Sequence, residues 1–411
     1  MLLSGARLAA EEAAVSVVRS ENDKTPAAII TDIKITGLKR TQPHIALAAL
    51  EKFRGRDSLA LDLNDVKAAV VDTGILDPVN VEIVTSDTGT TLDVKVQDKW
   101  AIFPIPLFMF GSDGVSFGGA FFDANAFGIN DKMSIAGLYS ETHWMINLMY
   151  MHAAAKRLPG FILSANYSNS KTERTDQSEN VYSRFKTDSI RVMAGLNYPF
   201  AQFFNAGLRF SFNYIWLNEF EDAINPPSSG AAHLGIHPSL GWRKVNWDGM
   251  LQSERQASVN YHANIDLEKN ESIQRVNLQL VWEQSIRTGF RFFGRGGASF
   301  STRITPLSSS SPHDAQVDIL PGKFFAQNIA GFQAGFENAL FSLKFGTFSV
   351  LACYQFVYSY SEPLGGSIDH GPAAGFRIYL RQLAIPAVGL KAGYNIAAQR
   401  LQWSFNIGMS M

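Results

Sequence analysis

Hydrophobic and polar side chains alternate over a long stretch near the end of the chain. Residues 346–361 have the sequence GTFSVLACYQFVYSYS, and every even position from Phe348 to Tyr360 is aromatic or aliphatic. Most odd positions are small or polar, with Leu351 and Val357 as exceptions. A period of two is the side-chain period of a β-strand, although strands of soluble proteins usually end after about 5–6 residues. The stretch therefore predicts a long strand with one aromatic face.

The same alternation recurs throughout the region that begins at Trp100. It is clear in four further segments, at residues 205–216, 258–266, 275–283 and 401–411. About sixteen such segments of roughly ten residues fit into this region. Because lipid requires every backbone polar group to be paired, strands of this kind span a membrane only as a closed barrel. We therefore predict a transmembrane β-barrel of about 16 antiparallel strands, with its aromatic face toward lipid and its polar face toward the lumen.

The lengths of the connecting segments agree with this topology. Long polar connectors lie at residues 170–180, 219–232, 305–325 and 361–371, whereas the connectors at 197–202 and 342–347 are short. Outer-membrane barrels have short periplasmic turns and longer external loops. Because the long connectors all follow odd-numbered strands, the first strand is expected to run outward from the periplasm. The longest connector, at 303–327, is expected to be external at its base and to fold into the lumen at its tip.

A different pattern precedes the barrel. Residues 30–37 alternate, residues 42–53 and 63–74 have helix-spaced apolar positions, and residues 78–98 form a hairpin pattern. Asn64 is expected to cap the second helix and Gly74 to end it. The order β-α-α-β-β gives a sheet with two helices on one face, which suffices for a small core. We therefore divide the chain into an N-terminal segment at 1–29, taken as a remnant of a signal peptide or linker, a small α/β domain at 30–98 and the barrel at 99–411.

Composition narrows the classes of function. The chain is 46% hydrophobic and 18% charged, with a formal net charge of −1, whereas typical soluble domains are about 25% charged. Because basic residues are not in excess, no nucleic-acid partner is expected. Cys353 is the single cysteine, so neither a disulfide framework nor a cysteine metal site is expected. No apolar run is long enough to predict a membrane-spanning helix.

Candidate chemistry is sparse. No G-x-S-x-G stretch and no Ser-His-acid set stands out, so we expect neither an enzyme nor a cofactor. His262 is expected to be a hydrogen-bonded lumen residue rather than a metal ligand, because no second His or Cys is spaced to help it. The segment GRGGASF at residues 294–300 lacks the Lys-Ser/Thr end of a phosphate loop. Its glycines are expected to let a barrel strand bend or twist.

Several motifs, taken together, resemble the BamA/TamA family of outer-membrane assembly barrels. The segments ITDIKITGLKR, LALDLNDVKAAVVDTGIL and VNVEIVTSDTGTTLDVKVQDKW resemble a POTRA (polypeptide-transport-associated) domain. The segment DANAFGINDKMSIAG is similar to that family's turn between the second and third strands, and GPAAGFRIYLRQLAIPAVGLKAGYNI to its late-barrel pattern. The resemblance implies a short, single-POTRA member, with the POTRA-like domain in the periplasm and the barrel in the outer membrane of a diderm bacterium.

The resemblance also implies a lock for the sixth external loop. In that family an Arg-Gly at the loop tip contacts an acidic residue on the thirteenth strand. Here Pro321 stands before Gly322 at the tip, and Gln355 stands at the acidic position, so both halves of the ion pair are missing. The loop is expected to be held by packing instead. The loop-lock candidates are Pro321, Gly322, Lys323, Phe324, Phe325 and Gln355.

The closure between the first and last strands is the second candidate site. The first strand carries Pro104 and Pro106, which cannot donate ladder hydrogen bonds, and a glycine in the last strand would weaken it further. We expect fewer or weaker hydrogen bonds at this closure than at any other strand pair. The lateral-seam candidates are Pro104, Pro106, Gly111, Trp403, Phe405 and Gly408.

The function implied by the resemblance is insertion or translocation of other proteins. The POTRA-like domain would hold an unfolded client, and the seam would open sideways to pair with it. The expected partners are outer-membrane lipid, unfolded outer-membrane or secreted clients and periplasmic accessory proteins, with the barrel itself monomeric. Two alternatives remain open: a passive pore or structural barrel, and a secretion translocator of the two-partner type.

Overall fold

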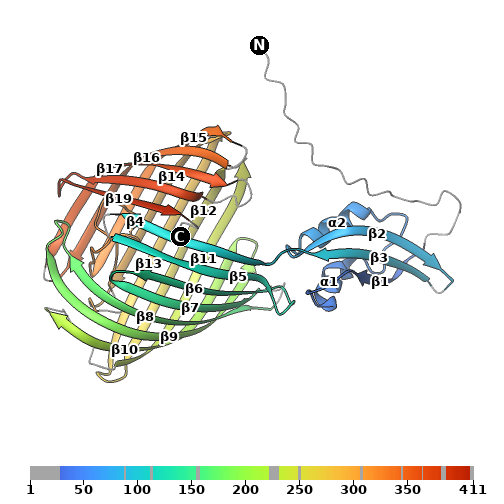
Figure 1. Ribbon diagram of the computed structural model, residues 1–411, viewed down its shortest axis with the longest axis horizontal. Helices are drawn as coiled ribbons and strands as arrows, with labels where there is room; N and C mark the ends of the chain where they lie inside the picture. The colour runs from blue at the N-terminus through green and yellow to red at the C-terminus, as the bar shows by residue number, and fades with distance from the viewer. Residues whose placement is uncertain are drawn as a thin grey trace, which may run out of the picture. The chain divides into compact units, whose positions relative to one another are not determined.

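The structure is a computed structural model that describes residues 28–87, 89–111, 114–153, 158–221, 231–248, 251–305, 309–343, 346–362, 364–380 and 386–407. The chain divides into two compact units (Figure 1). The first holds the residues up to Ile102 together with Ala124–Asp131, and the second holds Phe103–Asp123 and Lys132–Met411. The division therefore falls near the boundary expected from the sequence, except that residues 124–131 join the first unit.

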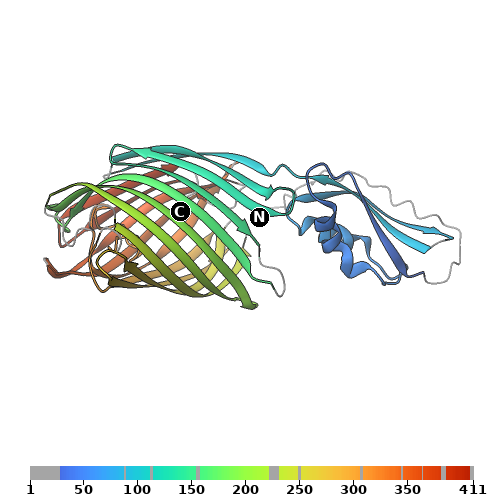
Figure 2. The ribbon, with the colours of Figure 1, turned by 90° about the horizontal axis from the view of Figure 1, so that it is seen from below.

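The first unit is a three-stranded sheet with helices on one face (Figure 2). Its elements are β1 (Ile30–Thr36), α1 (Pro43–Leu50), the 3₁₀ turn η1 (Glu51–Phe53), α2 (Leu63–Val71), β2 (Leu76–Ser86) and β3 (Gly89–Asp98). The strand order is β1-β3-β2, so β3 lies in the middle, parallel to β1 and antiparallel to β2. This is the β-α-α-β-β order predicted from the sequence.

Two details of this unit follow from local chemistry. The N-cap of α2 is Asp62, whose carboxylate accepts a hydrogen bond from the Asn64 N–H at 2.8 Å, so the expected cap at Asn64 was two residues late. Gly37 follows β1 with a φ of +91°, and a Cβ there would lie 2.1 Å from the Val96 carbonyl oxygen. Only glycine fits that close approach.

A hydrogen-bonded cluster joins distant segments of the first unit. The Asp98 carboxylate accepts from the backbone N–H groups of Lys39, Arg40 and Thr41 at 2.6, 3.1 and 2.9 Å, and also from the Thr41 hydroxyl. The Asn125 amide in turn donates to the Thr41 hydroxyl at 2.8 Å. The turn at 124–131 is therefore tied to β3 through one buried threonine.

The second unit is a closed barrel in which the described residues form sixteen strands, β4 to β19. The first eight are β4 (Ile102–Gly111), β5 (Gly114–Ala126), β6 (Asp131–Ser140), β7 (His143–His152), β8 (Gly160–Thr175), β9 (Val181–Ala201), β10 (Phe204–Glu221) and β11 (Ala231–Asp248). The others are β12 (Leu251–Asp266), β13 (Glu271–Arg287), β14 (Phe290–Ser301), β15 (Asn328–Ser342), β16 (Gly346–Ser361), β17 (Gly365–Leu380), β18 (Pro386–Asn395) and β19 (Arg400–Ile407). The predicted fold class and strand count are confirmed.

Side chains alternate between the outer face and the lumen, as β16 shows. Val350, Tyr354 and Phe356 are exposed on the outside, whereas Leu351 and Val357 point inward and are buried. Val357 packs in a cluster with residues 315–329, and Leu351 packs beside Phe293. These two exceptions to the sequence pattern therefore mark places where apolar side chains fill the interior.

The helices of the first unit are short. Among the described residues, none is both long and apolar enough to cross a membrane.

Candidate functional site

The long connector between β14 and β15 lies inside the barrel. Its described residues contact inward-facing side chains of several strands, and its tip is packed in an apolar cluster. That cluster consists of Ala315, Val317, Ile319, Leu320, Phe324, Ala326, Ile329 and Val357. We call residues 302–327 the inner loop.

Three glycines on the barrel wall allow the inner loop to approach closely. A Cβ at Gly297 on β14 would lie 2.0 Å from the Asp314 carbonyl oxygen, and one at Gly331 on β15 would lie 2.7 Å from that of Ala315. A Cβ at Gly393 on β18 would lie 3.0 Å from an Ile319 methyl group. Any larger residue at the first two positions would collide with the loop backbone. The glycine at 297, expected to bend the strand, therefore has a second role as part of a floor beneath the loop.

A polar contact fixes the same part of the loop. The side-chain oxygen of Gln355 accepts from the backbone N–H of Asp318 at 2.8 Å, and its amide donates to the Asp318 carboxylate at 3.2 Å. The Lys391 ammonium on β18 forms an ion pair with the same carboxylate and donates to Gln333 at 3.2 Å. The loop thus supplies the acid, and the wall supplies the base and two amides.

The residues predicted around Pro321 lie on the other side of this contact. Pro321 is buried, and its carbonyl oxygen accepts from the Phe324 N–H at 2.9 Å, while Gly322 is exposed. The Lys323 ammonium lies 3.2 Å from the Glu173 carboxylate, and its carbonyl oxygen accepts from the Thr175 N–H at 3.0 Å. Among the described contacts, the loop residue that reaches Gln355 is Asp318 rather than Pro321.

The two phenylalanines have different environments. Phe324 is 2% exposed within the apolar cluster. The Phe325 ring lies beside the Arg174 guanidinium, whose carbon is 5.7 Å from the ring centroid. Arg174 also faces the Phe185 ring at 5.0 Å and donates to the Thr305 carbonyl oxygen at 2.7 Å. Both rings therefore pack against neighbouring side chains, and charged contacts lie at both ends of the tip.

The closure of the barrel pairs β19 with β4. The described pairs are Ser404 with Gly111, Phe405 with Phe110, Asn406 with Met109 and Ile407 with Phe108. Pro104 and Pro106 precede the paired segment and are exposed, and Gly408 lies outside the described residues.

Aromatic rings cover this closure from outside. The Phe110 ring lies 4.6 Å from that of Phe405 and 5.6 Å from that of Trp403, measured between centroids. Phe108 extends the row at 5.5 Å from Phe110. Side-chain stacking thus spans the closure between the first and last strands.

No family model matches the sequence, and no curated protein matches it either. The fold does match solved structures. BamA from Haemophilus ducreyi lacking POTRA domains 1–3 matches with a TM-score of 0.69 at 14% identity, covering 94% of this chain and 85% of that one. This chain has the BamA fold.

Two CdiB structures match the BamA-fold chain as well. CdiB from Acinetobacter baumannii has a TM-score of 0.61 at 13% identity, covering 94% of this chain and 74% of that one. CdiB from Escherichia coli has a TM-score of 0.57 at 11% identity, covering 96% and 93%. Identities this low support a shared fold, which is the fold that the sequence motifs implied.

A buried charge network in the BamA-fold barrel was not predicted. The Arg291 guanidinium lies 2.6 Å from both the Glu283 and the Glu337 carboxylates. Glu337 also pairs with Arg377 at 3.1 Å and accepts from the Tyr379 hydroxyl at 2.7 Å, while Arg295 pairs with Glu283. These side chains tie together β13, β14, β15 and β17. The alternating pattern placed these charged residues on inward-facing positions. No feature of the sequence indicated which of them form ion pairs with each other.

His262 contacts a second histidine, although no other histidine is near it in the sequence. Its Nδ1 lies 2.9 Å from Nδ1 of His237 on the neighbouring strand, and Nε2 of His237 lies 2.7 Å from the Ser211 hydroxyl. The described residues contain no group of three or more His, Cys, Asp or Glu that could hold a metal ion. The arrangement is a hydrogen-bonded chain across three strands.

Proposed function

We propose that this protein is an outer-membrane barrel that inserts or translocates other proteins. Its outer face carries exposed aromatic and aliphatic side chains on every strand from β5 to β16, with Phe300 as the exposed aromatic on β14. Such a surface suits lipid, and the closed ladder leaves no strand edge facing it. The first unit would lie in the periplasm. The end of the barrel at which the inner loop joins β14 and β15 would face the outside of the cell.

The observation that carries the proposal is the closure between β4 and β19, where the first and last strands of the barrel meet. β4 carries Pro104 and Pro106, and neither has an N–H to donate to a neighbouring strand. Parting two strands costs fewer hydrogen bonds where fewer are made, so this is where the barrel opens most easily. The exposed backbone groups would then pair with a client strand, which keeps them from facing lipid alone.

A neighbouring part of the wall, from β13 to β17, supports opening at the closure rather than within that part. The network around Arg291 and Glu337 crosses four strands and is buried. Breaking a buried ion pair costs about 3–5 kcal/mol. Separation at those strands is therefore disfavoured relative to separation at the closure.

The small sheet of the first unit supplies an edge for the client. β2 has β3 as its single neighbour in the described sheet, so its outer edge can accept an extended segment by β-augmentation. Residues 81–86 are the usable part, because Pro78 lacks an N–H and the ladder is irregular between Pro78 and Asn80. Accessory periplasmic proteins could bind the same unit.

A reversible crosslink tests the opening. Phe110 and Phe405 are direct cross-strand partners, so the variant F110C/F405C, made in a C353S background, should form a disulfide across the closure. We expect oxidised protein to lose its support of outer-membrane protein assembly and to regain it with reductant. The control is F336C/A352C, which joins β15 to β16 and should leave function intact.

The clients are then identified by depletion. Loss of many unrelated barrel proteins from the outer membrane would support an insertase, and loss of one secreted protein would support a translocator. If no protein is lost, and the F110C/F405C crosslink leaves conductance unchanged, the passive pore is the better description.

A further inference from the structure

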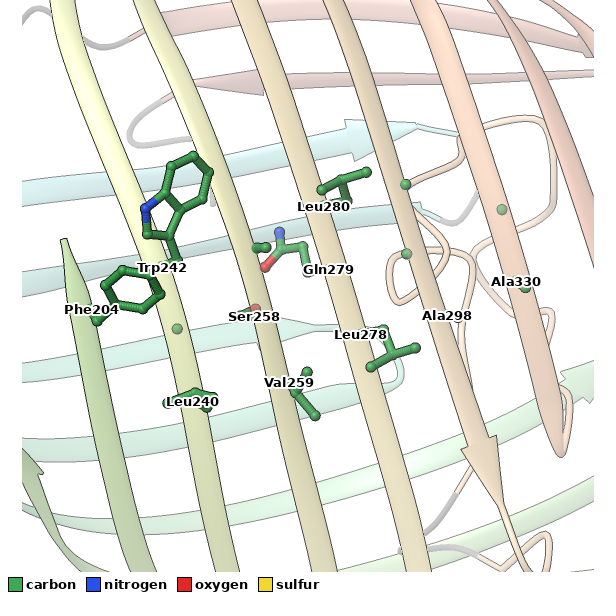
Figure 3. Close-up of a pocket in the computed structure, with 15 residues that line it drawn as sticks. Phe204, Leu240, Trp242, Ser258, Val259, Leu278, Gln279, Leu280, Ala298 and Ala330 are labelled. Atoms are coloured by element: carbon green, nitrogen blue, oxygen red, sulfur yellow. The ribbon is translucent and has the colours of Figure 1, made fainter.

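An apolar groove crosses the outer face of the barrel from β10 to β15 (Figure 3). Its volume is about 610 Å³. Large side chains stand on one side of it, and small residues form the floor on the other. The lining residues on which the inference depends are Trp242, Ala257, Leu280, Gly296, Ala298 and Ala330.

The groove exists because outward positions of two neighbouring strands are small. Gly296 and Ala298 on β14 and Ala330 on β15 occupy places where most barrel strands carry Leu, Phe or Tyr. Gly296 is directly opposite Phe332, and Ala298 is opposite Ala330. Space with so few polar partners is poorly suited to ordered water. A flexible hydrocarbon chain fits it better.

Two unpaired cations stand next to this groove. Lys244 follows Trp242 by two residues on the same face of β11, and Arg255 precedes Ala257 by two on β12. The two cations are direct cross-strand partners, and both are exposed. Like charges placed opposite each other destabilise a sheet unless an anion lies between them.

Nothing acidic offsets these charges in the described structure. Arg255 donates to the Gln284 side-chain oxygen at 3.0 Å, and the Lys244 ammonium lies 5.6 Å from the Phe203 ring centroid. Neither forms an ion pair with any described residue. The nearest carboxylate along the chain, that of Glu254, belongs to the inward side of β12 and pairs with Arg243.

We propose that this groove binds one anionic phospholipid, with its phosphate between Lys244 and Arg255 and one acyl chain over Gly296, Ala298 and Ala330. Arginine and lysine both bind phosphate, and tryptophan residues such as Trp242 are typical of the level where head groups lie. A membrane supplies the chain and the head group in one molecule, in the orientation that the groove requires. The site does not depend on whether the barrel inserts, translocates or conducts.

The test measures retained lipid on the full-length protein. Protein extracted from vesicles of phosphatidylglycerol and phosphatidylcholine into mild detergent is analysed by native mass spectrometry. We expect one phosphatidylglycerol per chain. The double variant A298F/A330F should lose it, whereas A263F, an alanine replaced on the outer face of β12 away from the groove, should keep it.

The head-group half of the site is tested separately. In K244Q/R255Q, phosphatidylglycerol retention should fall by roughly ten- to thirtyfold, because each cation near an anionic lipid surface contributes about a factor of five. The control R287Q removes another exposed arginine from β13 and should change nothing. Heat-modifiability on gels shows that each variant is folded, and K244Q/R255Q keeps the test decisive if A298F/A330F does not fold.

Equal phosphatidylglycerol retention by wild type and a folded A298F/A330F would overturn the proposal. So would unchanged preference for phosphatidylglycerol over phosphatidylcholine in K244Q/R255Q. Retention that falls equally in A263F or R287Q would likewise count against a defined site, because it would show a general effect of altering the outer face.

Discussion

At the scale of single residues, the contact between Asp318 and Lys391 shows how a loop can be fixed without the charges expected from the resemblance. The acid is on the loop and the base is on the wall, with Gln355 completing the contact. An amide can donate or accept, so Gln355 tolerates either charge beside it. We therefore expect the ion pair to form also when the acid and the base exchange positions.

The single variant K391M should loosen the inner loop, because the Asp318 carboxylate then loses its counter-charge in a half-buried place. Asp318 is 42% exposed in its side chain, so we expect a loss of about 1–2 kcal/mol rather than the larger cost of a fully buried pair. The exchange D318K/K391D should recover most of it. Faster proteolysis of the loop measures the effect, and an exchange variant no better than K391M would contradict it.

Asp98 gives a pH-dependent prediction for the first unit. Burial works against its ionised form, but hydrogen bonds from the Thr41 hydroxyl and from the N–H groups of residues 39–41 prevail and lower the pKa of the carboxyl. A lowered folded-state pKa means that the carboxylate stabilises the fold above the unfolded value of about 4 and that this stabilisation is lost as pH falls below it.

We therefore expect amide exchange at Thr41 to accelerate as the pH drops from about 5 to about 3, after correction for the intrinsic rate. The variant D98N should exchange faster at neutral pH and show little further change on acidification. Identical pH profiles for wild type and D98N would show that Asp98 is not the group responsible.

At the scale of elements, β14 and the inner loop depend on each other. Gly297 faces the loop, and Gly294 on the same strand faces outward with its nearest atoms, on Phe332, at 3.5 Å from a built Cβ. The variant G297A should push the loop off the wall, since its Cβ would overlap the Asp314 carbonyl oxygen. G294A should be tolerated. A cysteine placed at Ser310 should be labelled faster in G297A than in G294A, and equal rates would contradict the glycine floor.

The sequence was sufficient to predict the strands and helices, but it did not predict which distant side chains contact each other. Period-two patterning identifies strands because the pleat itself has that period, and connector lengths give their direction. Asp318 and Lys391 are 73 residues apart, and no periodicity links them. One usable signal was overlooked. Leu351 and Val357 are apolar residues on a polar strand face, and they indicated that apolar side chains pack inside the barrel.

At the scale of the whole molecule, the buried network around Glu337 should dominate the stability of the barrel. Glu337 is 0% exposed and contacts Arg291, Arg377 and Tyr379. In E337Q the buried Arg291 guanidinium and the half-buried Arg377 guanidinium lose their shared carboxylate, which should cost about 3–5 kcal/mol. The unfolding temperature read from heat-modifiability should fall markedly.

The control for that variant is E271Q. Glu271 pairs with Arg303 where both side chains are more than 40% exposed, so its loss should change stability by about 1 kcal/mol or less. A barrel as stable in E337Q as in E271Q would show that the network is not what holds that wall.

The same network has a consequence for how β14 finds its place. The strand contains Gly296 and Gly297 side by side, followed by Ala298. A shift of one residue normally turns every side chain to the wrong face, and that penalty is what aligns a strand with its neighbours. In this stretch the penalty is small for a shift in one direction, because Gly296 would take the place of Gly297 and Gly297 that of Ala298. Arg291 and Arg295, both drawn to Glu283, supply the missing alignment. During assembly, weakening these charges should therefore yield misaligned barrels rather than merely less stable ones.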